Sequence, residues 1–218
     1  SPEFCRMLIE AYPGSERMAT ADVGLPLHIA CRRNTVATAE YLYKLYPECI
    51  NLADEKGRYP IHCAILGLDE RINPTTAIEM VKFLLDCDPN VASQTVNGIF
   101  SPLFMVCVLE ESGVNVAPIM SVVLTALHLL YDTHPEAIEE NAIEAFLDRF
   151  PEEIRNFINA QRRYALQARD STLMNTRDVN GQLPLQSALC TDNVTLGSIK
   201  LLVKGNRDAV RVPDHWGW

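Results

Sequence analysis

Apolar residues along the chain recur at the spacing of α-helices that bury one face. Between residues 112 and 131 they fall at Ile119, Val122, Val123, Ala126, Leu127 and Leu130, and farther on at Phe150, Ile154, Phe157 and Ile158. Positions three and four apart lie on one side of a helix, so each set forms a continuous apolar stripe. The pattern predicts an all-α protein whose helices each pack one face against a neighbour.

A proline recurs thirteen residues ahead of successive apolar helix starts. The matched pairs are Pro13 with Pro26, Pro47 with Pro60 and Pro89 with Pro102. Ahead of Pro184 the matching residue is Ser171, so the first proline of the pair is lost there. Proline is well tolerated in the first turn of a helix, where its missing N–H leaves no bond unmade. The constant offset predicts a repeating unit, and a unit of this size buries its apolar face only by stacking on its neighbours.

Glycines mark a second register of the same repeat. Glycine supplies the positive φ that a tight turn needs. We therefore predict short β-hairpin turns at Asp54–Gly57, Thr95–Gly98 and Asp178–Gly181, with Gly24 as the equivalent of Gly57. From Gly98 to Gly181 the gap is 83 residues, about twice the 41 that separate Gly57 from Gly98. This spacing predicts one degenerate unit at about 136–172.

The combined motif, D-x-x-G-x-x-P-L-H-x-A followed by an apolar helix, resembles the ankyrin repeat. The family's T-P-L-H corresponds to Leu25-Pro26-Leu27-His28 and Tyr59-Pro60-Ile61-His62. The threonine is missing in each copy, and so is the glycine that the family places between its two helices. The resemblance implies an all-α helical solenoid of about five helix-pair repeats with short hairpin turns, formed as a single array by residues 5–218. We interpret residues 1–4 as the remnant of a cleaved expression tag.

The register assigns each repeat unit a pair of helices. The expected pairs are 26–33 with 36–45, 60–66 with 75–87, 102–110 with 118–133, 142–148 with 151–169, and 184–190 with 195–204. Residues 5–12 are expected to form the second helix of a truncated first unit, and residues 214–218 to open a further unit. Asp192 or Asn193 is the expected cap of the helix at 195–204.

Charge and cysteine usage exclude several classes of function. The net charge of −9 leaves little to attract nucleic acid, whose backbone is bound by clustered lysine and arginine. Residues 112–131 carry no charge, but Gly113, Asn115, Pro118 and the apolar stripe favour a core helix over membrane insertion. The seven cysteines form no CxxC or CxxH pair, which argues against disulfides and a zinc site. We expect an intracellular protein, cytoplasmic or nuclear, in a reducing compartment, with neither metal nor cofactor.

His28 and His62 are the histidines of the repeat motif, and they could be catalytic bases. In the family this histidine ties the preceding hairpin to the helix through backbone hydrogen bonds, and a neutral imidazole suits that role. Phe104 and Gln186 occupy the position in other units, so we interpret the histidines as structural, together with Gly57, Gly98 and Gly181.

Two cysteines near these histidines, Cys31 and Cys63, could form a nucleophile or metal site. No orienting acid recurs with them, and we interpret both as packed apolar side chains. The chain contains no phosphate-binding loop or hydrolase motif. We therefore do not expect an enzyme.

The resemblance implies a concave binding surface made of hairpin tips and first helices. The candidate partner-binding residues are Arg58, Tyr59, Ile99, Phe100, Gln182 and Trp216 on the hairpins, and Ile29, Arg32, Arg33, Leu66 and Met105 on the helices. Aromatic residues and arginine dominate many interfaces. Tyr59 and Phe100 can equally fill the space left by the missing threonine. The favoured function is a protein–protein interaction module that binds another protein or peptide; the alternative is a regulatory or targeting domain of a larger enzyme.

Acidic residues are concentrated in the degenerate unit, between Glu136 and Glu153. They either form the solvated face of a helix pair, with acids favoured near helix N-termini, or a docking patch for a basic partner. Glu139, Glu140 and Glu144 are the candidate residues of that second patch. The apolar stripe at Ile154, Phe157 and Ile158 is expected to be buried against the adjoining units.

Overall fold

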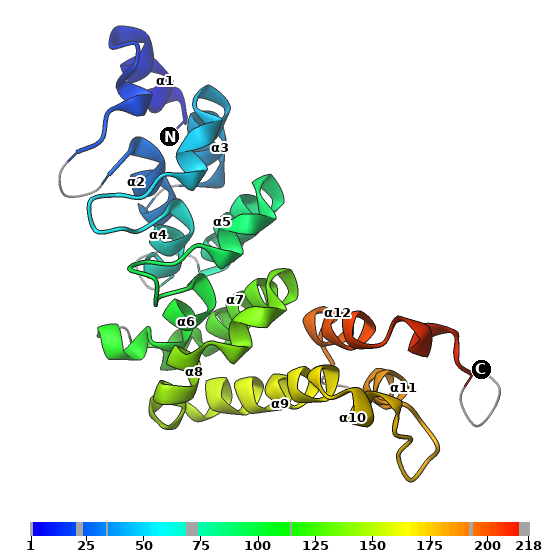
Figure 1. Cartoon of the computed structure of the whole chain (residues 1–218). Helices are drawn as coiled ribbons and strands as arrows, with labels where there is room; N and C mark the ends of the chain where they lie inside the picture. The colour runs from blue at the N-terminus through cyan, green and yellow to red at the C-terminus, as the bar shows by residue number, and fades with distance from the viewer. Residues whose placement is uncertain are drawn as a thin grey trace. The chain divides into compact units, whose positions relative to one another are not determined.

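The computed structural model describes residues 2–20, 24–33, 35–68, 74–113, 115–191 and 194–213 (Figure 1). These residues are mostly helical, and among them β-structure is limited to two isolated bridges. The prediction of an all-α chain is confirmed. The chain divides into two compact parts, residues 1–129 and 130–218, and each is described by itself.

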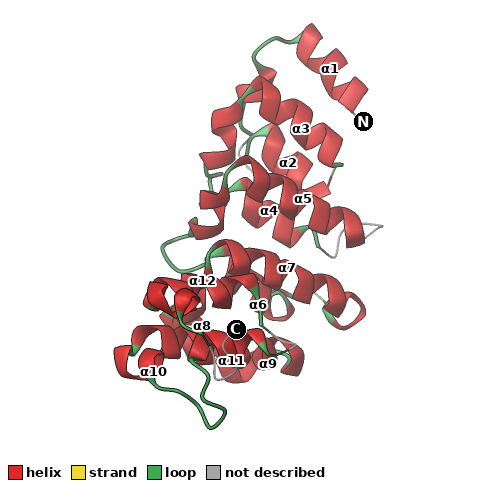
Figure 2. Cartoon of the chain, turned by 90° about the vertical axis from the view of Figure 1, so that its right-hand side faces the viewer, coloured by secondary structure: helices red, strands yellow, loops and turns green. Residues whose placement is uncertain are grey.

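The N-terminal part consists of two rows of helices. One row, the inner helices, contains α2 (Pro26–Arg33), α4 (Pro60–Leu66) and α6 (Pro102–Cys107). The other row, the outer helices, contains α1 (Pro2–Ala11), α3 (Val36–Leu45), α5 (Pro74–Cys87) and most of α7 (Met120–Thr133). Within the rows, α4 contacts α2 and α6, and α3 contacts α1 and α5. Figure 1 and Figure 2 show α3 and α5 lying alongside α2 and α4.

The C-terminal part is built on one long helix. Its helices are α8 (Asn141–Phe146), α9 (Glu152–Arg169), α10 (Ser171–Asn175), α11 (Pro184–Leu189) and α12 (Leu196–Gly205). Helix α9 packs against α12, α10 and the segment 135–139. Ile154, Phe157 and Ile158 are buried on α9, and the Phe157 and Tyr131 rings form a T-shaped pair with 5.9 Å between centroids. The predicted burial of this stripe is confirmed.

A short 3₁₀ turn follows each of the helices α3, α5, α7 and α12, with one residue between the helix and the turn. Three of these turns begin at a proline, namely Pro47–Asn51, Pro89–Ser93 and Pro135–Glu139, and a fourth spans Arg207–Arg211. At the place where Ser171 replaces the proline, a full α-helical turn forms instead, α10. Asp170 caps it by accepting hydrogen bonds from the N–H groups of Thr172 and Leu173 at 2.8 and 3.2 Å. Helix α10 was not predicted.

Hydrogen-bonded turns occur at two of the predicted hairpins as expected. The N–H of Asp54 donates to the carbonyl of Arg58 at 2.8 Å, and the N–H of Asp178 donates to the carbonyl of Gln182 at 2.9 Å. Each aspartate side chain also accepts two backbone N–H bonds inside its turn, at 2.8 to 2.9 Å. The D-x-x-G pattern therefore forms a turn in which the aspartate carboxylate accepts backbone N–H groups. In a longer hairpin, hydrogen bonds between the two strands would satisfy such groups.

Two register predictions were wrong. The third hairpin closes between Val96 and Phe100 rather than at Thr95–Gly98, because both Asn97 (φ 54°) and Gly98 (φ 72°) adopt the left-handed conformation. The first hairpin closes between Thr20 and Gly24. In all four hairpins the closing residue stands two positions before the proline of the next helix, so Gly24 corresponds to Arg58 and not to Gly57.

The degenerate unit differs from the others in having no hairpin. The 3₁₀ turn Pro135–Glu139 is separated from α8 by Glu140 alone. Other helix ends differ from expectation by a few residues: α6 stops at Cys107, and α7 starts at Met120 after a 3₁₀ turn at Ala117–Ile119. Residues 2–4, interpreted as a tag remnant, belong to α1.

The cap of α12 was assigned to the wrong residue. Thr195 caps this helix, and its hydroxyl oxygen accepts from the N–H of Ser198 at 3.2 Å. Asp192 and Asn193 lie outside the described residues. Across the described part of the chain, no helix combines the length and apolarity needed to cross a membrane.

Candidate interaction surface

His28 joins the start of its own helix to the hairpin of the next repeat unit. Its Nδ1 accepts from the N–H of Leu25 at 3.2 Å, which caps α2. Its Nε2 lies 3.1 Å from the carbonyls of Leu52 and Arg58. Because carbonyls only accept, Nε2 carries the proton and Nδ1 does not, so both contacts require the neutral ring. The histidine therefore ties its helix to the following hairpin, whereas the family resemblance pointed to the preceding one.

The same pair of hydrogen bonds recurs in two other repeat units. His62 accepts from the N–H of Tyr59 at 3.3 Å and donates to the carbonyl of Phe100 at 3.1 Å. Gln186 accepts from the N–H of Leu183 at 2.9 Å, and its amide donates to the carbonyl of Val212 at 2.8 Å. A glutamine thus performs the same task as the histidines, which supports a structural role for this position.

Phe104 cannot make these bonds, and a different residue caps its helix. The hydroxyl of Ser101 accepts from the N–H of Phe104 at 3.2 Å. The helix start is therefore satisfied without a polar side chain at the third position.

The protonation states around the motif histidines do not favour acid–base or nucleophilic chemistry. Burial lowers the pKa of His62 to about 4, and it also lowers the pKa of His28. Burial raises the pKa of the Cys63 thiol to about 11, so the reactive thiolate is scarce at neutral pH. Cys31 is fully buried. Among the described residues no cluster of three or more metal-ligating side chains occurs.

Three hairpins of the N-terminal part lie next to one another. A Cβ placed on Gly24 would lie 2.8 Å from Cβ of Asp54, and one placed on Gly57 would lie 3.6 Å from Cγ1 of Val96. The third hairpin carries Ile99, which is 53% exposed, and Phe100, which is 37% exposed. The Phe100 ring stacks on Phe104 at 5.5 Å between centroids. Phe100 is therefore both partly packed and partly available to a partner.

Three of the candidate arginines meet around one hollow. Arg32, Arg33 and Arg58 line a space of about 280 Å³ together with His28, Ile29 and Cys63. Arg58 is held in place by Asp54, whose carboxylate accepts from its Nε at 2.8 Å and from a terminal nitrogen at 2.6 Å. We name this group the arginine hollow.

The remaining candidates are distributed more widely. Tyr59, Leu66 and Met105 are half-buried, and the Tyr59 ring lies against the His62 ring at 5.8 Å between centroids. Gln182 belongs to the C-terminal part, where its amide lies 3.6 Å from Sγ of Cys190. Trp216 lies outside the described residues.

The acids of the second candidate patch have internal partners. Arg169 forms an ion pair with Glu139, and Arg162 with Glu144. Farther along, Lys204 pairs with Glu136 at 2.8 Å. Glu139 and Glu140 are half-buried, while the other acids of the run are exposed, as predicted. The ion pairs reduce the negative charge available to a basic partner, and this weakens the docking-patch interpretation.

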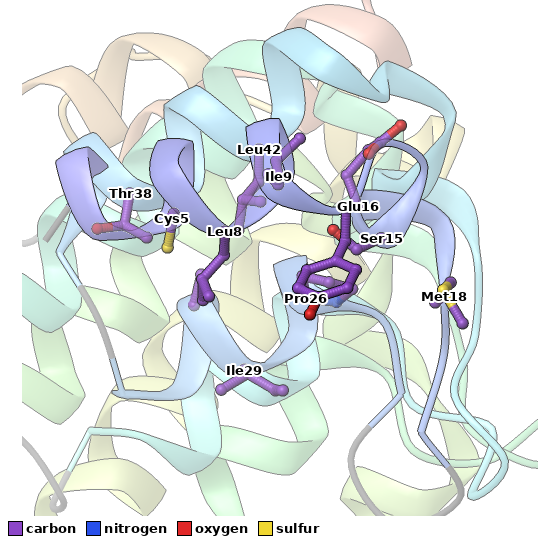
Figure 3. A pocket seen from close by; sticks show the side chains of 12 residues that line it. Cys5, Leu8, Ile9, Ser15, Glu16, Met18, Pro26, Ile29, Thr38 and Leu42 are labelled. Carbon is purple, nitrogen blue, oxygen red and sulfur yellow. The ribbon is translucent and has the colours of Figure 1, made fainter.

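Sequence reasoning missed an apolar hollow beside α1. A space of about 460 Å³ lies among α1, α2 and α3, and its walls are mainly apolar side chains (Figure 3). Helix α1 buries none of its residues, and Leu8 is 46% exposed. The sequence did contain a signal for this hollow. Residues 4–12 are largely apolar, and the helix expected there had no first helix to pack against.

Comparison with models of known protein families, with curated proteins and with solved structures found no match for this chain.

Proposed function

We propose that this chain is an ankyrin-type repeat module that binds another protein or peptide through its hairpins and inner helices. The double hydrogen bond of His28, His62 and Gln186 supports this interpretation, because it links successive repeat units by the same geometry. The order of inner helix, outer helix and 3₁₀ turn also recurs along the chain. Stacked units of this kind present extended surfaces, which suit macromolecular partners.

The observation that carries the proposal is the composition of the surface formed by the second and third hairpins. Ile99 and Phe100 expose apolar area on one hairpin, and Arg58 stands on the hairpin beside it, at the edge of the arginine hollow. Aromatic and arginine side chains contribute strongly at the centres of interfaces. Arg58 is paired with Asp54, so the chemistry that best complements this surface is an apolar side chain packed against Ile99 and Phe100.

The first step of the experiment is to identify a partner. Affinity capture with the purified chain, followed by mass spectrometry, identifies candidates, and the affinity of each purified candidate is then measured by calorimetry. Ile99→Asp is compared with Leu45→Asp, which introduces the same change at a partly exposed apolar position on the outer helix α3. Because an unpaired charge in an interface centre is costly, Ile99→Asp should weaken binding at least about tenfold.

Thermal unfolding of both variants gives the control for folding. The expected result is a normal melting temperature for both and a loss of affinity for Ile99→Asp alone. Equal affinities for the two variants, with both folded, would show that the hairpin surface does not bind that partner.

A further inference from the structure

A second hollow lies in the C-terminal part, along the solvent-exposed side of its long helix. It encloses about 700 Å³ and is lined by residues of α8, α9, α10 and the turn Pro135–Glu139, all of which belong to this part (Figure 1). Its walls include two leucines, three arginines and two glutamates. We name this hollow the α9 groove.

The two leucines of the α9 groove are exposed. Leu166 of α9 is 65% exposed, and Leu173 of α10 is 45% exposed. Helix α9 buries its opposite side, with Ile154, Phe157 and Ile158, so Leu166 is an apolar residue on the polar side of an amphipathic helix. A single exposed leucine is ordinary, but two leucines in one hollow form an apolar surface that a partner side chain can cover.

Two of the three arginines already have carboxylate partners. Arg162 forms an ion pair with Glu144, and Arg169 forms one with Glu139. In each pair one member is largely exposed, because the Glu144 side chain is 66% and the Arg169 side chain 69% accessible to solvent. Exposed ion pairs contribute little to stability, since water screens both charges. A carboxylate from a partner can therefore replace Glu144 on Arg162 at low cost.

Arg163 is the arginine of the groove that lacks a carboxylate. It precedes Leu166 by three residues, which places the two side chains next to each other on α9. Its guanidinium donates to the Tyr164 hydroxyl at 3.3 Å and lies 5.1 Å from the centre of that ring, and no ion pair joins it to another described residue. A guanidinium has five N–H donors and binds a carboxylate with two of them. Arg163 thus presents unused donors beside an exposed leucine.

The charge of the α9 groove favours one kind of partner. Three arginines and two glutamates leave one positive charge in excess, on a chain whose net charge is −9. One carboxylate matches this excess. A polyanion, such as nucleic acid or an anionic membrane, would instead meet Glu139 and Glu144 and the repulsion of the whole chain.

We propose that the α9 groove binds a peptide segment of a partner protein that packs an apolar side chain against Leu166 and Leu173 and places a carboxylate on Arg163. The sign of this recognition is opposite to that of a docking patch for a basic partner, because Glu139 and Glu144 are held by arginines of the groove itself. The site lies entirely in the C-terminal part and stands whether or not the hairpin surface of the N-terminal part binds a partner.

The test uses short synthetic peptides and the full chain labelled with nitrogen-15. Each acetylated peptide carries one leucine and one glutamate, whose separation varies across the panel, and a matched set has glutamine in place of glutamate. Chemical shifts are followed up to millimolar peptide. Glutamate peptides should shift the amides of Leu166 and Leu173 and the Nε–H of Arg163. The best of them should bind at least about fivefold more tightly than its glutamine match.

Matched variants assign the binding to the groove. Arg163→Gln should remove the preference for glutamate, whereas Arg207→Gln, at an exposed arginine of the same part outside the groove, should keep it. Leu166→Ser should weaken the binding of every peptide, whereas Leu189→Ser, at a leucine of α11 that is 59% exposed, should not. Thermal unfolding checks that all four variants are folded.

Glu144→Gln gives a result that a purely apolar contact would not produce. The substitution frees Arg162, so the affinity for glutamate peptides should rise while the affinity for glutamine peptides stays unchanged.

Four results would overturn the proposal. The first is the absence of shifts at Leu166 with every peptide of the panel. The second is equal affinity for glutamate and glutamine peptides. The third is inorganic phosphate alone shifting the same resonances as strongly, which would show a simple anion site. The fourth is a chain that is dimeric by light scattering and becomes monomeric with Leu166→Ser, because a second copy would then cover the groove.

Discussion

Replacing His62 tests the hydrogen bond that joins successive repeat units. Gln186 makes the equivalent two bonds with a glutamine side chain. His62→Gln should therefore keep the contacts to Tyr59 and Phe100, and unfold within about 1 kcal/mol of the wild type at pH 7.5. His62→Ala leaves the N–H of Tyr59 and the carbonyl of Phe100 without this partner, which costs about 1–3 kcal/mol. Comparing the two variants separates the loss of the hydrogen bonds from the loss of the imidazole ring.

The contribution of His62 to the pH dependence of folding stability can be calculated from its lowered pKa. Burial lowers the pKa of His62 from 6.5 to about 4. Because the folded-state pKa is the lower one, the unfolded state binds more protons between these values, and stability falls as the pH falls. The contribution is fully present above pH 6.5 and is lost as the pH drops through 4. Between pH 7.5 and 5.0 the loss amounts to about 2 kcal/mol for this one group.

The assay is urea unfolding of the wild type, His62→Gln and His62→Ala at pH 7.5 and pH 5.0. His28 and the carboxylates titrate in all three proteins, so the difference between wild type and His62→Gln isolates the one ring. We expect this difference to shift by about 2 kcal/mol in favour of the glutamine variant at the lower pH. An identical pH dependence in both proteins would refute the role assigned to burial of the ring. A glutamine variant as unstable as the alanine variant at pH 7.5 would refute the equivalence with Gln186.

Two pairs of substitutions probe close packing and capping. Gly67→Ala should lower the free energy of unfolding by about 3 kcal/mol, because the new Cβ would lie 2.2 Å from the Arg32 carbonyl oxygen. Gly113→Ala, at a position with φ 88° and open space, should lower it by only about 1–2 kcal/mol. Equal shifts in the urea midpoint would contradict this. Thr195→Ala should cost about 1 kcal/mol by removing the cap of α12, and Thr195→Ser should retain most of the stability; a serine variant as unstable as alanine in thermal unfolding would argue against capping by the hydroxyl.

Much of the helical framework was predictable because its boundaries are encoded locally. The helices at 26–33, 36–45 and 60–66 agree with the expected spans. A proline in the first turn fixes the start of two of them, and Thr35 caps the third through a bond from the N–H of Thr38 at 3.4 Å. Helix α10 was missed because its start carries a different local signal. Ser171 replaces the proline of the other units, and Asp170 starts the helix by capping it.

The hairpin register was less predictable because glycine was used as its marker. Positive φ is needed somewhere in each turn, but turns of different length place it at different positions. The hairpin at 96–100 uses Asn97 and Gly98 in succession, whereas the hairpin at 54–58 uses Gly57 and an aspartate side chain. The hydrogen bond that closes the turn, two residues before the proline, is the invariant feature, and it is visible only in the structure.

The candidate surface could be predicted in part. The sequence placed Arg32, Arg33 and Arg58 on one surface, and the structure brings all three to one hollow. The sequence could not show that Arg162 and Arg169 pair with acids 18 and 30 residues earlier, since such contacts depend on how α9 packs. The direction of the His28 bond was missed for the same reason, because its acceptors lie 24 and 30 residues away along the chain.

Variation at the third position of the inner helices shows what the chain requires there. Two units use histidine and one uses glutamine, and all three side chains accept from the start of their own helix and donate to a carbonyl farther along the chain. An acid–base role would not tolerate glutamine, whose amide does not titrate. Where the position is Phe104, the repeat unit that follows has no hairpin: the turn Pro135–Glu139 is separated from α8 by Glu140 alone. The pair of bonds shared by His28, His62 and Gln186 identifies the motif as a connector between repeat units.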